Sequence, residues 1–317
     1  MRFFRSLEAC IWLPAALLVT WSGSAQGVPP APRLRPDQIL IYQLETGGRR
    51  STKVESRVTS PQSPPGTDLN SHCLLQVNVV EVTASGFLLK TYLSEKDSAP
   101  SPGATRSGSE SGPDKLVEVS ISREGSASNI KGLDQLSPSQ QFAWNAWLSR
   151  FTSSLTFPKL GVRRGQRWET SEPERAPSPI GGLSWKRKYE YVKQEPCEPS
   201  ADRAAKGKAY KAQPAVDLCA VVLVRAQLHQ KTSAKNATPP DYKLRGLTTR
   251  GTATGTNETI LYISTITGIM VRSTEDVQQS MDAIVGLEDG SNQVRYVIDA
   301  KSRTQIQLLP DVPQGVP

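Results

Sequence analysis

The amino-acid sequence predicts a mainly β fold of the α+β class, in which a large curved antiparallel meander sheet wraps one apolar helix like a half-barrel. From Gln38 onward, apolar runs of strand length alternate with Gly, Pro and Ser breakers. Residues Ile260 to Ile263 are apolar at both alternating positions, so their strand requires cover on both faces. Residues 142–151 form an apolar helical pattern that can supply this cover.

Two other arrangements of the strands remain open, a closed up-and-down barrel and a sandwich. An outer-membrane barrel fits less well, because such barrels need strands of about 10 residues with polar inward faces. The apolar helix, the long polar insertions and the Pro-containing tail at 310–317 are not typical of that class.

The N-terminus has the pattern of a secretory signal peptide over residues 1–25. Arg2 and Arg5 precede an apolar run from Ala9 to Trp21, and small residues at 22–25 predict cleavage after Ala25. The run is shorter than the ~20 residues that a spanning helix needs. We therefore expect an exported protein, periplasmic or extracellular, with no membrane span in the mature chain.

A Pro-rich leader at 26–36 precedes a single β-rich domain at 37–309. In its first part, Gly47-Gly48 and Ala84-Ser85-Gly86 predict hairpin turns, and the apolar parity changes between Val79 and Val80, which predicts a bulge. The strands expected there are 38–45, 51–59, 74–83, 87–93 and 116–122.

The second part of the domain is predicted to be a meander with polar insertions. Its expected strands are 183–194, 216–229, 243–253, 258–266, 269–287 and 293–309, the last interrupted near Lys301. The segments 94–114, 171–182 and 195–215 are polar and poor in apolar side chains, so we expect them to be mobile insertions.

One long helix is predicted over residues 138–151. Ser137-Pro138-Ser139-Gln140 has the capping-box pattern with proline at the first helical position. Its polar residues recur every fourth position and leave only a narrow wet stripe, at Gln141, Asn145 and Ser149. Trp144, Trp147 and Phe151 are therefore expected to be core residues or, alternatively, to face a ligand.

Residues 163–168, "RRGQRW", predict a tight turn that opens a strand. Gly165 allows a positive φ, and Trp168 can pack the turn onto the core. Stacking of Trp168 on a ligand is the alternative.

Three cysteines remain after the predicted cleavage, and an oxidising compartment favours one disulfide. Cys197 lies in a Pro-flanked loop and Cys219 near the start of the following strand, so we expect these two to be bridged. Cys73 is then a buried thiol. Other pairings remain open.

The positive charge of the chain, +8, is spread thinly along the sequence. Its densest part includes Lys186, Arg187 and Lys188, which we interpret as a solvated surface. Export and the lack of a known module argue against nucleic-acid binding.

Catalytic constellations are not apparent in the sequence. The chain has only two histidines, and His72 next to Cys73 would point to the opposite face of a strand. Ser128 to Lys131 matches a Ser-x-x-Lys string without its companion motifs. The acid pairs at 275–276 and 288–289 and the Asn-x-Thr strings at 236–238 and 257–259 are interpreted as turn residues. We expect no enzyme, no metal and no cofactor.

Several short motifs resemble a family of uncharacterised secreted bacterial β-rich proteins. They are "GVRRGQRWE" at 161–169, "GTATGTNETILYISTITGIMVRS" at 251–273, "YQLET" at 42–46 and "VNVVEVTASGF" at 77–87. Gln166 stands where the family often has Asp. The resemblance spans most of 37–309 and implies an exported β-rich fold, similar in architecture to the half-barrel lipoprotein carriers of the bacterial envelope. It carries over no catalytic or binding residue.

These observations lead to a functional hypothesis. We expect a non-enzymatic envelope protein that binds a lipid or other apolar ligand, or an envelope protein partner, through its curved sheet. A structural or assembly protein with a solid core is the alternative, and an unrecognised hydrolase is a third possibility.

Overall fold

The structure is a computed structural model that describes residues 32–56, 67–68, 70–95, 115–158, 162–174, 178–197 and 217–310. The residues outside this description include the predicted signal peptide and most of the Pro-rich leader, of the predicted insertions at 94–114 and 195–215, and of the tail. The first two residues of the insertion at 94–114 belong instead to β4 (Gly86–Glu95). Within the described residues, the strands are accompanied by α1 (Pro138–Ser153), α3 (Pro240–Lys243) and the 3-10 turn η1 (Leu133–Gln135).

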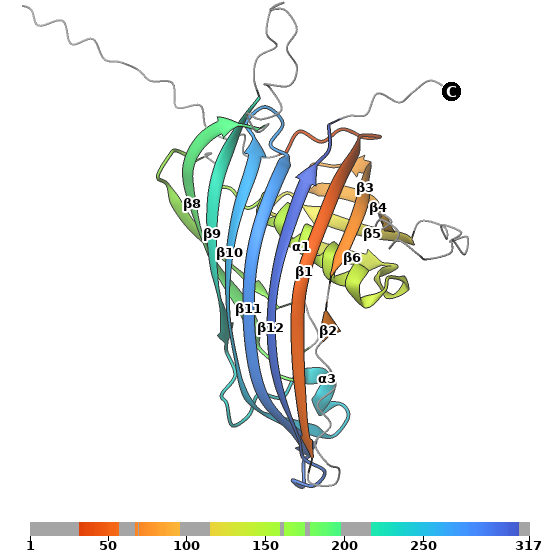
Figure 1. Cartoon of the computed structure of the whole chain (residues 1–317), viewed down its shortest axis with the longest axis vertical. Helices are drawn as coiled ribbons and strands as arrows, with labels where there is room; N and C mark the ends of the chain where they lie inside the picture. The colour runs from red at the N-terminus through yellow and green to blue at the C-terminus, as the bar shows by residue number, and fades with distance from the viewer. Residues whose placement is uncertain are drawn as a thin grey trace, which may run out of the picture.

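One sheet contains all twelve strands (Figure 1). They are β1 (Ile39–Ser56), β2 (Thr67–Asp68), β3 (Ser71–Val82), β4 (Gly86–Glu95), β5 (Lys115–Ser122), β6 (Ala127–Lys131), β7 (Arg167–Pro173), β8 (Leu183–Pro196), β9 (Leu218–Gln230), β10 (Leu247–Ser264), β11 (Met270–Leu287) and β12 (Val294–Leu308). Their order is β6-β5-β4-β3-β1-β12-β11-β10-β9-β8-β7, and β2 pairs with β1.

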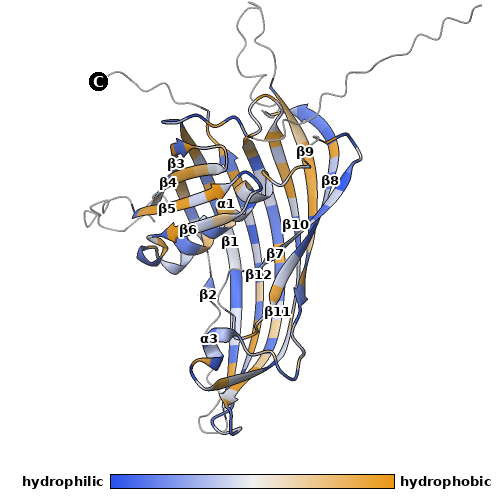
Figure 2. Cartoon of the chain, turned by 180° about the vertical axis from the view of Figure 1, so that it is seen from behind, coloured by the Kyte–Doolittle hydropathy of each residue, from blue (hydrophilic) through white to orange (hydrophobic). Residues whose placement is uncertain are grey.

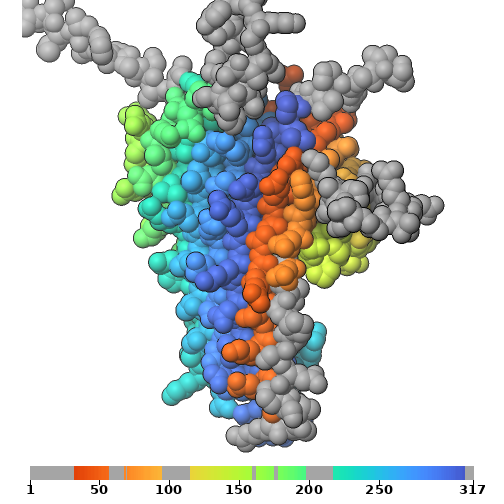
Figure 3. All heavy atoms as spheres, viewed as in Figure 1, coloured from red at the N-terminus to blue at the C-terminus, as the bar shows by residue number. Residues whose placement is uncertain are grey.

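The sheet is curved and open, with β6 and β7 at its two ends. Every pairing is antiparallel, and β1 joins the two halves of the sheet by pairing with β3 on one side and β12 on the other. Figure 3 shows β1 and β12, from the two ends of the chain, side by side on the outer face. The half-barrel prediction is confirmed.

Helix α1 fills the upper part of the concave face. In Figure 2, α1 lies across the upper half of this face, and α3 lies near its lower end. The capping box is present: Gln140 N donates to Ser137 Oγ (3.3 Å), and Ser137 N donates to Gln140 Oε1 (2.9 Å). Trp144, Trp147 and Phe151 are fully buried, and Trp144 Nε1 donates to Thr91 Oγ1 on β4 (2.9 Å).

The hairpin predicted around Gly47-Gly48 is wrong, because β1 runs through both glycines without a turn. A Cβ on Gly48 would lie 3.0 Å from Ser302 Cβ and 3.1 Å from the carbonyl oxygen of Lys301 on β12. The glycine therefore permits a close approach of neighbouring strands. The prediction is also wrong for β10, which is one continuous strand where two were expected, at 243–253 and 258–266.

Other strand boundaries agree better with the sequence. The second hairpin is confirmed, and its register shifts between Val79 and Glu81 as the bulge requires. The interruption predicted near Lys301 is wrong, because β12 continues through this residue, which pairs with Arg49 and Gln278. Part of the segment expected to be a mobile insertion at 171–182 is ordered: residues 171–173 belong to β7, and Ile180 is buried.

The predicted disulfide between Cys197 and Cys219 is present, with a Cα–Cα distance of 4.8 Å. It joins the end of β8 to the start of β9, and Cys73 is buried elsewhere. No helix within the described ranges is long and apolar enough to cross a membrane.

Opening this disulfide is expected to lower the free energy of unfolding by about 3 kcal/mol, because the bridge closes a loop across a sequence separation of 22 residues. The measurement is denaturant unfolding of Cys197→Ser/Cys219→Ser beside the parent. Peptide mapping without reduction should yield one linked pair, 197 with 219. A linked peptide that contains Cys73 would contradict the assignment.

Candidate functional site

A pocket of about 220 Å³ opens on the concave face, between α1 and the sheet below it. We call it the concave pocket. Its apolar lining is Phe142, Ala146, Pro173, Trp185, Val277 and Ala300, and its main polar lining is Ser149, Arg150, Glu172, Arg187, Asn257 and Glu275. Five strands, β7, β8, β10, β11 and β12, and the helix thus contribute side chains to one site.

The helix contributes one continuous face to this pocket. Residues 142, 145, 146, 149 and 150 follow the spacing i, i+3, i+4, i+7 and i+8, so they lie along one side of α1. The two tryptophans of α1 point instead into the core. The wet stripe predicted from Asn145 and Ser149 is therefore the pocket-lining side: Asn145 is exposed and Ser149 half-buried.

A buried ion pair forms the wall of the pocket next to the helix. Arg150 on α1 pairs with Glu275 on β11, and both side chains are almost fully buried. Asn257 Nδ2 on β10 also donates to Glu275, and Thr259 Oγ1 donates to Asn257 Oδ1 (2.8 Å). The carboxylate of Glu275 is thus engaged by two donors from different elements.

Burial lowers the pKa of Arg150, and the nearby charge of Arg187 lowers it further, while Glu172 opposes the shift. An arginine nevertheless keeps its proton in proteins, and the paired carboxylate of Glu275 favours the charged form. The pair therefore links the helix to the sheet as two opposite charges.

A second arginine, Arg187 on β8, lies beside this pair and is only 5% exposed. Its Nη2 donates to Ser149 Oγ (3.1 Å), and its Nε lies 3.7 Å from Glu172 Oε2, which is too far for a hydrogen bond. Among the described residues Arg187 Nε has no hydrogen-bond partner. The prediction of a solvated basic surface is wrong for Arg187, because alternation along β8 turns it inward between Trp185 and Tyr189.

The far side of the pocket is closed by a contact between Glu174, which follows β7, and strands β8 and β11. Trp185 Nε1 donates to Glu174 Oε2 (2.6 Å), and Gln279 Nε2 donates to the same oxygen (3.4 Å). Below it, a second apolar cluster fills the lower part of the sheet. Its buried members are Ile180, Ala237, Ala253 and Ala283.

The aromatic residues proposed from the sequence belong to the core. Trp144, Trp147 and Phe151 are buried in the main cluster. Trp168 stacks on Tyr189 with ring centroids 5.1 Å apart and also contacts Phe157 (5.3 Å). Gly165 has φ 81°, as the predicted turn requires.

His72 is exposed and Cys73 is fully buried, so they point to opposite faces of β3 as predicted. His229 lies on β9, and the Ser-x-x-Lys string falls on the exposed strand β6. Across the described segments, no group of three or more His, Cys, Asp or Glu side chains could hold a metal ion.

Glu275 and Asn257 are predicted to be turn residues, and this prediction is wrong, because both lie within long strands. For Glu275, the sequence of β11 does indicate a buried position. Its even-numbered positions from 272 to 282 are polar, whereas Val277, Met281 and Ala283 share the odd parity of Glu275. A carboxylate on the apolar side of a strand requires a buried partner.

No family model matches the chain, and no curated protein matches it. Solved structures that match the chain in shape include two bacterial proteins. The crystal structure of Ail, the attachment invasion locus protein of Yersinia pestis, aligns with 86% of this chain and 99% of its own, at 6% identity and a TM-score of 0.13. The crystal structure of an outer membrane channel from Pseudomonas putida F1 aligns with 88% of this chain and 98% of its own, at 10% identity and a TM-score of 0.19. TM-scores this low do not establish a shared fold.

Proposed function

We propose that this chain is a non-enzymatic, exported binding protein that holds a small amphipathic ligand in the concave pocket. The observation that carries the proposal is the composition of that pocket: an apolar floor with a few converging polar side chains, built on a rigid sheet and helix. Its volume of about 220 Å³ is below the ~300–1,000 Å³ of sites for drug-sized ligands, so the ligand is small or enters only in part.

Two features support export. The first 25 residues have the charge and apolar pattern of a signal peptide. The disulfide between Cys197 and Cys219 is typical of a protein that matures in an oxidising compartment. Both features support a periplasmic or extracellular location.

A structural or assembly role is the second candidate, and a specific observation favours it. The upper part of the concave face is packed solid by α1, with Trp144, Trp147 and Phe151 fully buried. If the concave pocket holds only water, the whole sheet is a scaffold. The two candidates therefore differ in whether this pocket is occupied.

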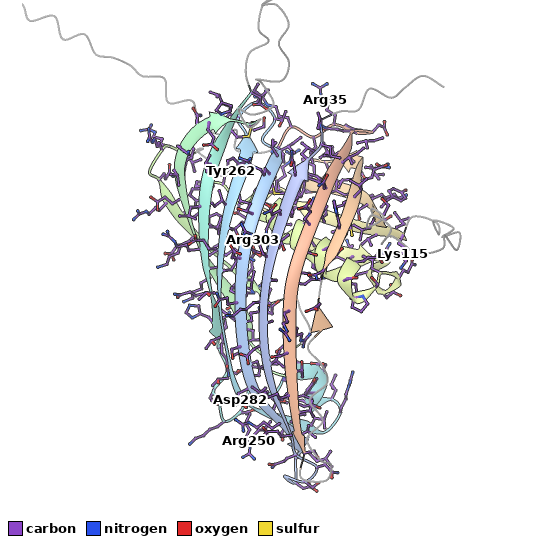
Figure 4. All side chains as sticks on the ribbon, in the orientation of Figure 1. Arg35, Lys115, Arg250, Tyr262, Asp282 and Arg303 are labelled. Atoms are coloured by element: carbon purple, nitrogen blue, oxygen red, sulfur yellow. A yellow bond between two sulfur atoms is a disulfide. The ribbon has the colours of Figure 1, made fainter. Side chains whose placement is uncertain are left out.

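Filling the pocket is expected to abolish ligand binding. Ala300 on β12 is a small pocket-lining residue, so the indole of Ala300→Trp would occupy the space. The matched control is Arg303→Trp on the same strand, where the side chain is exposed on the outer face (Figure 4). The measurement is native mass spectrometry of protein purified from its own cells.

An apolar or amphipathic molecule bound to the parent and to Arg303→Trp, and lost from Ala300→Trp, would support the proposal. A parent that carries no ligand, and that binds none of a series of decyl amphiphiles added to it, would favour the structural role.

A further inference from the structure

We infer that the ligand of the concave pocket is an anionic amphiphile whose carboxylate or phosphate head is bound by Arg187 and Ser149. This inference rests on the proposed function and specifies the chemistry of its ligand. It follows from which hydrogen-bonding groups in the pocket are already engaged and which are not.

The carboxylates of the pocket have partners. Glu172 forms an ion pair with Arg187, with its Oε2 3.7 Å from Nε, so an anionic head would share Arg187 with it. Glu275 is held by Arg150 and Asn257. Glu174 accepts from Trp185 and Gln279. A cationic ligand would have to displace these donors.

The donors of the pocket have spare capacity. A guanidinium carries five N–H donors in a planar fork. Arg187 makes a hydrogen bond to Ser149 through Nη2, and its Nε reaches no acceptor in the described part of the chain. Ser149 Oγ accepts that bond, so its own hydroxyl proton can be donated to a ligand. A buried arginine with spare donors favours a carboxylate or phosphate, which both accept a two-pronged bond.

The charged side chains leave one cation for a ligand inside the pocket. Arg150 is held by Glu275, and Arg49 and Lys301 pair with each other across β1 and β12 on the outer face, the side of Arg303. The cation available to a ligand is therefore Arg187.

The apolar lining accounts for the rest of the ligand. Ala146 and Phe142 lie on α1 one and two turns before Arg150, and Val277 and Ala300 lie on the facing strands. A short alkyl chain along these residues would remove apolar surface from water. The head would then sit near Ser149, and the chain would follow the helix toward Phe142.

The test uses four probes that share one chain: decanoate, decyl phosphate, decanol and decyltrimethylammonium. Isothermal titration calorimetry measures their affinities for the full-length mature protein. We expect at least one of the two anions to bind about tenfold or more tightly than decanol, because a hydrogen bond to a charged group contributes that much. The two anions distinguish a carboxylate ligand from a phosphate ligand.

Two variants locate the head group. Arg187→Met should bring the affinity for the preferred anion down to that for decanol, while decanol binding shows that the pocket is intact. Lys188→Met is the matched control, since Lys188 is exposed on the opposite face of β8, and it should bind as the parent does. Should Arg187→Met fail to fold, Asn145→Asp places a negative charge at an exposed pocket position and should weaken anion binding alone.

Anions that bind no better than decanol would overturn the inference, as would a preference for decyltrimethylammonium. Unchanged anion binding in both Arg187→Met and Asn145→Asp would also overturn it. In each of these cases, binding of decanol would show that the pocket still holds an amphiphile, so the proposed function would stand. If no probe binds, the proposed function fails and the inference fails with it.

Discussion

Replacing Trp147 with alanine is expected to lower the free energy of unfolding by about 3–5 kcal/mol. Its side chain is 0% exposed. The indole contacts Tyr42 of β1, with ring centroids 6.2 Å apart, and Phe151 of α1, at 5.1 Å. Truncation therefore leaves a cavity between the helix and the sheet that rigid strands cannot close. Denaturant unfolding, followed by circular dichroism, measures the loss.

The matched control is Asn145→Ala, two residues away on the exposed side of α1. Its effect should stay within about 0.5 kcal/mol, because surface positions outside special motifs contribute little. Equal stability of the two variants and the parent would mean that α1 covers the sheet loosely. Weak protection of the amides of α1 from hydrogen exchange would then be expected as well.

The helix was predictable because its signals are local. The capping box at Ser137 and the spacing of Asn145 and Ser149 all lie within one segment of sixteen residues. These patterns need no knowledge of the sheet. The hairpin at 84–86 also has a local signal, and it is confirmed. The alternation of Val117, Val119 and Ile121 predicts one buried strand face, and all three side chains are buried.

The lengths of β1 and β10 were not predictable from local pattern. Gly-Gly at 47–48 has the composition of a turn, and only the backbone of β12 next to Gly48 explains why it remains in a strand. Gly255 in β10 is similar, because an added Cβ would lie 3.0 Å from the ring of Trp185. A glycine that permits close contact cannot be distinguished from a glycine that turns the chain until its neighbour is known.

The concave pocket depends on contacts between distant parts of the chain. Arg150 and Glu275 meet only because α1 is placed under the sheet, and Arg187 joins them from a third element. The position of the helix follows from local patterns alone. For Glu275 the available indication is its place among apolar residues of the same parity in β11.

Removing one member of the buried ion pair should be strongly destabilising. Glu275→Leu leaves the guanidinium of Arg150 buried without its carboxylate, since both side chains are almost fully enclosed. Breaking a buried pair in this way costs about 3–5 kcal/mol. Asp276→Leu is the matched control, because Asp276 is the adjacent carboxylate in β11 and its side chain is 69% exposed. We expect the control to remain within about 0.5 kcal/mol of the parent.

The double variant Arg150→Met/Glu275→Leu tests the physical reason for this loss. Two apolar side chains of similar size remove both charges, so neither has to be desolvated without a partner, and stability should return close to that of the parent. Urea unfolding of the parent, both single variants and the double variant forms a complete cycle. Recovery in the double variant would show that the cost lies in the isolated charge. A double variant as unstable as Glu275→Leu would show instead that the loss arises from the hydrogen bonds of Glu275 to Asn257 and Thr259 in β10.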